Sequence, residues 1–251
     1  MSLLSPKVRV AMTPGRVAVA DGRNVREAEV AAPGWAGALE ALSGLLAGAG
    51  LSGRANVTLS HHFAPVHLLT SPAVALKPLE MQGWIRDTLA KQFGEAGRGW
   101  QVAWQPEPPG RSFIASSFDP AQLAELEGVL GKFALKAASV QPWLAASWNR
   151  QRRRIGRGRA WYALAEPGRL TLLGLEGGQV KSLRSSLFQD DAIDALADVL
   201  TRETLLAGEA VAAPLWVESA VLRPNWQELG GGRSVHPLPQ GREALAALVG
   251  N

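Results

Sequence analysis

The chain has 251 residues, enough for one large domain or two small ones, and 47% of them are hydrophobic, so it can bury a substantial core. It contains no cysteine, which excludes disulfides, thiolate–metal sites and a cysteine nucleophile. Its formal charge of +4 would be −2 without six arginines that stand close together, so the chain is slightly acidic with one basic cluster: Arg150, Arg152, Arg153, Arg154, Arg157 and Arg159.

The first elements predicted are three short strands, a helix and a fourth strand. Alternating apolar residues indicate strands at 8–12, 17–19 and 25–30, and turn residues separate them. Leucines on one face predict a helix over 35–49, and a strand follows at 55–60. The opening of the chain is therefore predicted to be an antiparallel meander that leads into a helix and a further strand.

A polar, proline-rich stretch leads to Pro78, and several short elements follow it. In chain order these are an amphipathic helix with Met81, Trp84, Ile85 and Leu89, strands at 101–105 and 112–116, a helix capped by Asp119, a strand at 135–140 and a short helix that ends at Asn149. These elements extend the first half with a small inserted subdomain.

The opening pattern returns after the arginine cluster. The elements predicted there are strands at 160–165, 170–175 and 179–185, a helix that starts at Asp190 or Asp191, a strand at 214–218 and a terminal helix over 242–249. We therefore expect an α/β protein of two similar halves, residues 1–150 and 151–251, each with a mixed sheet that begins with an antiparallel meander. The repeat is one of structural pattern and not of sequence.

This doubled pattern is similar to that of the actin-like, ribonuclease-H-like superfamily. The chain resembles the actin-like pilus-assembly proteins and the cytoplasmic domain of the L subunit of type II secretion systems. The resemblance depends on the strand at 55–60, the stretch Ser139-Val140-Gln141-Pro142 with Asn149 after it, and the double strand at 161–175. It implies a cytoplasmic protein, peripheral at the inner membrane, that docks onto a membrane partner's cytoplasmic segment or onto a secretion ATPase. Some relatives bind ATP between the halves, and others have lost that site.

Nucleotide binding in this fold uses an acidic residue and a glycine in the first turn of each half. The acid holds metal-bound water, and the glycine lets backbone N–H groups approach phosphate. The first turn has Thr13 and Gly15 but no acid, and the second has Glu166 and Gly168. Because a proline interrupts both turns, we interpret them as plain hairpin turns, and we expect no cofactor.

Other catalytic patterns are absent from the sequence. A ribonuclease-H nuclease needs a carboxylate on the first strand, and 8–12 has none, while Asp190, Asp191 and Asp194 suit a helix start. His61, His62 and His67 have no acidic neighbour to complete a zinc site, so we interpret them as ordinary loop histidines. No catalytic residue and no metal site is therefore predicted.

The arginine cluster and the tryptophans are the remaining candidates for binding. The cluster is interpreted as a solvated linker loop, with an electrostatic contact to a partner or an anionic lipid surface as the alternative. Nucleic acid is disfavoured, because no second basic surface extends the cluster. Three tryptophans stand beside turns, where grooves often form. The candidate partner-binding residues are Trp35, Trp84, Trp100, Arg152, Arg153 and Arg154.

Three hypotheses for function follow, ranked by how well the sequence features support them. The first is a non-catalytic actin-like scaffold that binds a membrane partner's cytoplasmic segment in bacterial pilus or type II secretion assembly. The second is a nucleotide-binding ATPase of the same fold, and the third is a nucleic-acid-binding protein that uses Arg150–Arg159.

Overall fold

The computed structural model of the chain describes residues 8–22, 24–189, 191–206, 208, 213–220, 225–229, 232–240 and 249. The chain divides into two compact units, residues 1–143 together with 248–251, and residues 144–247. Apart from Val249, the terminal helix predicted over 242–249 lies outside the described residues, as does Asp190.

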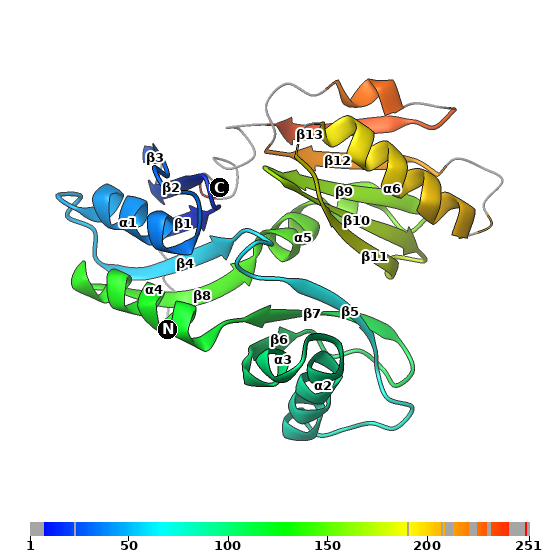
Figure 1. The fold of residues 1–251 in the computed structure, drawn as a ribbon, viewed down its shortest axis with the longest axis horizontal. Helices are drawn as coiled ribbons and strands as arrows, with labels where there is room; N and C mark the ends of the chain where they lie inside the picture. Colours follow the sequence, from blue (N-terminus) through cyan, green and yellow to red (C-terminus); the bar gives the residue numbers. More distant parts are fainter. Residues whose placement is uncertain are drawn as a thin grey trace. The chain divides into compact units, whose positions relative to one another are not determined.

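The first unit is built on a sheet of five strands in the order β3-β2-β1-β4-β8 (Figure 1). Its strands are β1 (Val8–Met12), β2 (Arg16–Asp21), β3 (Asn24–Glu29), β4 (Gly53–Leu59) and β8 (Leu135–Pro142). β1 pairs antiparallel with β2 and parallel with β4, and β8 is parallel to β4. Helices α1 (Trp35–Leu46) and α4 (Pro120–Lys132) pack their apolar residues on one core with Val10 and Val57.

A smaller sheet is inserted between β4 and α4. Its elements are β5 (Val66–Thr70), α2 (Pro78–Phe93), α3 (Glu95–Gly99), β6 (Gln101–Trp104) and β7 (Ser112–Phe118). The three strands are antiparallel in the order β5-β7-β6, and α2 packs on them through Ile85 and Leu89 (Figure 1). The sequence analysis missed β5, which it assigned to the proline-rich stretch before Pro78.

The second unit repeats the order of the first sheet. Its strands β9 (Ala160–Glu166), β10 (Arg169–Glu176), β11 (Gln179–Leu187), β12 (Leu215–Ser219) and β13 (Val235–Gln240) are arranged as β11-β10-β9-β12-β13. Helix α6 (Ala192–Leu206) covers one face through Leu196 and Leu200, and a 3-10 turn, η1 (Trp226–Leu229), precedes β13. β13 was not predicted, because its two prolines argue against a strand within a sheet. β13 lies at the edge of the sheet, where proline is tolerated.

These two sheets confirm the predicted fold class. Each begins with an antiparallel meander and continues with a strand parallel to the first, so each is mixed. The boundary at residue 150 stays a prediction, and it falls inside helix α5 (Trp143–Ile155).

Helix α5 corrects the interpretation of the arginine cluster. The short helix was expected to end at Asn149 and the cluster to form a linker loop, but the helix continues through Arg154 to Ile155. Arginine is a good helix former, which the search for apolar periodicity did not weigh. The helix ends where Gly156 adopts a left-handed backbone conformation, with φ of 77°.

A buried carboxylate fastens α5 to the second sheet. Glu218 on β12 is fully buried and alternates with Leu215 and Val217, which face α6, so it faces the opposite side. There it accepts a hydrogen bond from the Ser147 hydroxyl and one from the Arg150 guanidinium, the latter at 2.8 Å. Tyr162 on β9 bonds to Ser147 and lies 3.4 Å from the same carboxylate. Burial raises the pKa of Tyr162 well above its usual range, and the Glu218 charge adds to that effect.

This arrangement predicts that the Glu218 side chain is needed for the stability of the second unit. The variant Glu218→Ala leaves Arg150 without its carboxylate and the Ser147 hydroxyl without its acceptor, so we expect the free energy of unfolding to fall by about 3–5 kcal/mol. Glu176→Ala removes a carboxylate of the same type from an exposed ion pair with Arg159, and it should cost at most about 1 kcal/mol. Urea unfolding of both variants measures the difference, and equal losses would contradict the assigned role of Glu218.

Candidate functional site

The first predicted phosphate turn, residues 13–16, uses its backbone donors internally. The Thr13 amide donates to the Arg16 carbonyl oxygen at 2.8 Å, and the Arg16 amide donates to Thr13 Oγ1 at 2.9 Å. The Thr13 hydroxyl in turn donates to the Arg16 carbonyl at 2.8 Å. Pro14 has no N–H, so only the Gly15 amide remains for a ligand. A phosphate needs several converging N–H groups, and this turn does not offer them.

The second predicted phosphate turn is a tight hairpin. Glu166 and Arg169 pair across it, Pro167 and Gly168 form its tip, and Gly168 has φ of 72°, as a type II turn with proline requires. The Arg169 guanidinium donates to Ser185 Oγ at 3.1 Å. Burial lowers the pKa of Arg169, and the charge of Glu166 opposes that shift. Both turns connect antiparallel strands, and their lack of nucleotide binding stays a prediction.

The carboxylates and histidines singled out in the sequence have local structural contacts. Asp191 precedes α6, and its side chain accepts from the Ile193 amide at 2.6 Å. His67 lies on strand β5 and not in a loop, which corrects the prediction for this residue. It bonds to Ser117 Oγ at 2.9 Å, and burial lowers its pKa to about 4, so it is neutral at pH 7. In the described part of the chain, no three His, Asp or Glu residues are placed to share a metal ion.

A groove of about 340 Å³ lies in the first unit between the small sheet and the main sheet. We call it the first-unit groove. It is lined by β6, by the end of β7, by α4 and by β8, through Gln101, Ala103, Phe118, Pro120, Leu123, Ala124, Glu127, Ala137, Ala138, Ser139 and Val140. Most of these side chains are small or apolar.

Two sheet edges meet at this groove. β6 is the last strand of the small sheet and β8 is the last strand of the main sheet, and no further described strand pairs with either edge. At Ala138 the register between β8 and β4 shifts, and Ser139 beside it donates to the Asn56 side chain at 2.8 Å. An edge strand presents N–H and C=O groups on its outer side, and another extended chain can pair with such an edge.

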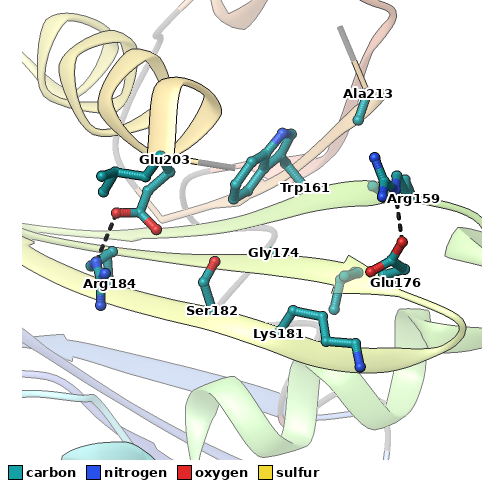
Figure 2. A pocket seen from close by; sticks show the side chains of 12 residues that line it. Arg159, Trp161, Gly174, Glu176, Lys181, Ser182, Arg184, Glu203 and Ala213 are labelled. Carbon is teal, nitrogen blue, oxygen red and sulfur yellow. Dashed lines mark hydrogen bonds and ion pairs between the residues drawn. The ribbon is translucent and has the colours of Figure 1, made fainter. Parts of the chain in front are cut away.

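A pocket of about 330 Å³ in the second unit is of a different kind (Figure 2). Two ion pairs bound it, Arg184 with the buried Glu203 at 2.7 Å and Arg159 with Glu176 at 2.8 Å. The Trp161 ring lies over Gly174, where an added Cβ would come within 2.9 Å of it. Both carboxylates of the pocket are thus engaged by arginines, which argues against a role as metal ligands or as a general base.

The candidate partner-binding tryptophans are all half-buried in packing contacts. The Trp35 indole donates to Glu125 at 2.8 Å, and its ring meets Phe63 edge-on. Trp84 packs near Phe113, and Trp100 stacks on His67 at 6.2 Å between ring centres.

Arg152, Arg153 and Arg154 lie exposed on α5 in the second unit. The candidate residues thus fall into separate places and form no single site, and their part in partner binding stays a prediction. The sequence analysis missed the first-unit groove, since strands 101–104 and 135–142 come together only through the fold.

Comparison with solved structures identifies the fold. The chain is similar to the cytoplasmic domain of EpsL, an inner membrane component of the type II secretion system of Vibrio cholerae, with TM-score 0.63 and 14% identity over 97% of this chain and 94% of that one. It is also similar to a chain of a PilM–PilN type IV pilus biogenesis complex, with TM-score 0.63 and 11% identity over 98% and 90%. A third likeness is to a Bacteroides thetaiotaomicron protein with an actin-like ATPase fold, with TM-score 0.62 and 10% identity over 97% and 96%.

The chain therefore has the actin-like fold, and the resemblance to pilus-assembly proteins and to the type II secretion L subunit is confirmed at the level of structure. No family model matches the sequence, and no curated protein matches it. Among the described residues, no helix has the length and apolar character needed to cross a membrane.

These turns predict that ATP with magnesium does not bind appreciably. The first turn retains one amide for phosphate and lacks an acid, and Pro167 removes a donor from the second. Isothermal titration of the chain with ATP and magnesium should give no heat of binding at micromolar concentrations. A dissociation constant in the micromolar range would contradict this account and favour the ATPase hypothesis.

Proposed function

We propose that the chain is a non-catalytic scaffold that binds a cytoplasmic segment of an inner-membrane protein in the assembly of a pilus or a type II secretion system. Two similar structures support the proposal. One is described as the cytoplasmic domain of an inner membrane secretion component, and the other comes from a PilM–PilN pilus biogenesis complex. The same proposal places the chain at the cytoplasmic face of that membrane.

The non-catalytic part of the proposal follows from the two turns. The actin-like fold can be that of an ATPase, but an ATPase has to hold the phosphates and a metal ion. Here the Thr13 and Arg16 amides are hydrogen-bonded within their own turn, and Pro14 and Pro167 have no N–H to offer. These hydrogen bonds are those of β-hairpin turns and not those of a phosphate-binding loop.

The binding part of the proposal depends on one observation: two sheet edges, with which no other strand among the described residues pairs, meet at the first-unit groove. A partner segment that enters in extended conformation can continue the β8 edge and gain main-chain hydrogen bonds. The four β8 residues that line the groove would pair with about 13 Å of extended chain. Alanines at 103, 124, 137 and 138 leave room for its side chains.

This proposal predicts that a bulky side chain in the groove blocks the partner. Ala124 is exposed on α4 and lines the groove, so Ala124→Trp fills the space without disturbing the core. The probe is a fluorescent peptide with the sequence of the cytoplasmic segment of a candidate inner-membrane partner. We expect its affinity, measured by fluorescence anisotropy, to fall at least about tenfold, because an occupied groove forfeits its buried contacts.

Ala121→Trp is the matched control, because Ala121 is exposed on the same helix and does not line the groove. It should leave the affinity unchanged. N-methylation of alternate peptide amides tests the strand itself, since one set of amides faces the β8 edge and the other does not. Equal affinities for wild type and both variants, or equal tolerance of both methylation patterns, would contradict the proposed groove.

A further inference from the structure

The basic cluster contains two kinds of arginine. Arg150 is ion-paired with the buried Glu218, and Arg159 is ion-paired with Glu176. For Arg152, Arg153, Arg154 and Arg157, in contrast, no carboxylate within salt-bridge distance is found among the described residues, and all four are exposed. The first two arginines are engaged within the protein, and the other four are available to a partner.

These four arginines gather at one end of α5. Arg152, Arg153 and Arg154 occupy its last turn, and successive helical residues point about 100° apart, so the three spread around the helix end. The Arg157 side chain lies along Gly178 in the turn between β10 and β11, at 3.4 Å from the position of an added Cβ. We call Arg152, Arg153, Arg154 and Arg157 the α5 cationic tip.

No negative charge nearby in the sequence weakens the tip. Between Glu127 and Glu166 the chain has no acidic residue. The C-terminus of α5 contributes partial negative charge, and one or two of the nearby arginines neutralise it. The remaining charge faces solvent, and a surface of this kind attracts an anionic surface at physiological ionic strength.

The surroundings of the tip favour a lipid surface over a protein or a nucleic acid. Protein interfaces need apolar anchors among their charges, and none of the large apolar side chains that are exposed in the described residues lies on α5. Single-stranded nucleic acid needs aromatic rings to stack on its bases. Trp161 is only 4% exposed, and Trp148 packs edge-on against the buried Tyr162.

We propose that the α5 cationic tip binds the headgroups of an anionic lipid bilayer. This inference rests on the proposed function, which places the chain at the inner membrane, and it adds a second, electrostatic contact to the peptide groove. Four arginines give weak and reversible binding that is lost at high salt, because each contact is screened within about a nanometre. Such a contact orients the chain at the membrane, and the groove selects its partner.

The test is co-sedimentation of the full chain with vesicles of phosphatidylcholine containing 30% phosphatidylglycerol. The variant Arg152→Gln, Arg153→Gln, Arg154→Gln keeps helix propensity and removes three charges. Its partition coefficient should fall on the order of a hundredfold, because each basic residue near such a surface contributes about fivefold. Wild type should not bind pure phosphatidylcholine vesicles, and it should leave the anionic vesicles at 500 mM salt.

Two further variants separate the tip from general effects of charge. Arg54→Gln, Lys91→Gln, Lys132→Gln removes the same net charge from exposed positions of the first unit, and it should bind as wild type does. Arg152→Lys, Arg153→Lys, Arg154→Lys keeps the charge and should also bind. Equal losses in the tip variant and the first-unit variant would overturn the inference.

A lack of wild-type binding to the anionic vesicles would also overturn it, and so would tighter binding to a 30-nucleotide single-stranded DNA. Failure of lipid binding by the tip is distinguishable from failure of peptide binding in the groove. The tip variant should keep full affinity for the partner peptide, because the groove lies wholly in the first unit.

Discussion

Each backbone N–H group needs a hydrogen-bond acceptor. In this chain two N–H groups of the first turn find acceptors within the turn, whereas the outer N–H groups of two sheet edges do not bond to another described strand. At the first turn, the Thr13 and Arg16 amides are bonded within four residues, and Pro14 removes a third. β6 and β8 are the edge strands of their sheets, and their outward N–H and C=O groups bond to no other described strand. This difference between the turn and the two edges is the basis of our proposal that the chain binds a peptide and no nucleotide.

Helix α5 depends on a second constraint, the cost of burying the Glu218 carboxylate. Such a charge is tolerated only when donors surround it, and Ser147, Tyr162 and Arg150 do so. Two of these donors stand on α5, so the helix is fixed against the second sheet, and its last turn, with Arg152, Arg153 and Arg154, extends the same rigid element. The network that stabilises the unit therefore also positions the α5 cationic tip.

Local sequence signals predicted most of this fold and little of the candidate site. Strands such as 8–12 and 160–166 carry regular alternation or apolar runs, and Asp119 with Pro120 marks the start of α4 by capping the first turn. β13 escaped prediction because Pro237 and Pro239 argue against a strand until its place at a sheet edge is known. The closed state of the first turn was inferable from Pro14, but the hydroxyl of Thr13 as its internal acceptor was not.

The first-unit groove and the Glu218 network lay beyond the reach of sequence patterns. The groove needs residues 101–103 to lie near 137–140, and the network needs Ser147 near Glu218, 71 positions away. No local propensity encodes such pairs, since they arise from strand order. The arginine cluster was recognised as a feature, but its division into ion-paired and exposed residues depends on the same long-range contacts.

Hydrogen–deuterium exchange of the chain, alone, with the partner peptide and with ATP and magnesium, tests the central claim most directly. The account predicts that the peptide slows exchange in β8, because strand addition pairs the outer amides of that strand. It predicts no change at residues 13–16 or 166–169 with ATP. Slowed exchange in those turns with ATP, together with no change in β8 with the peptide, would contradict it.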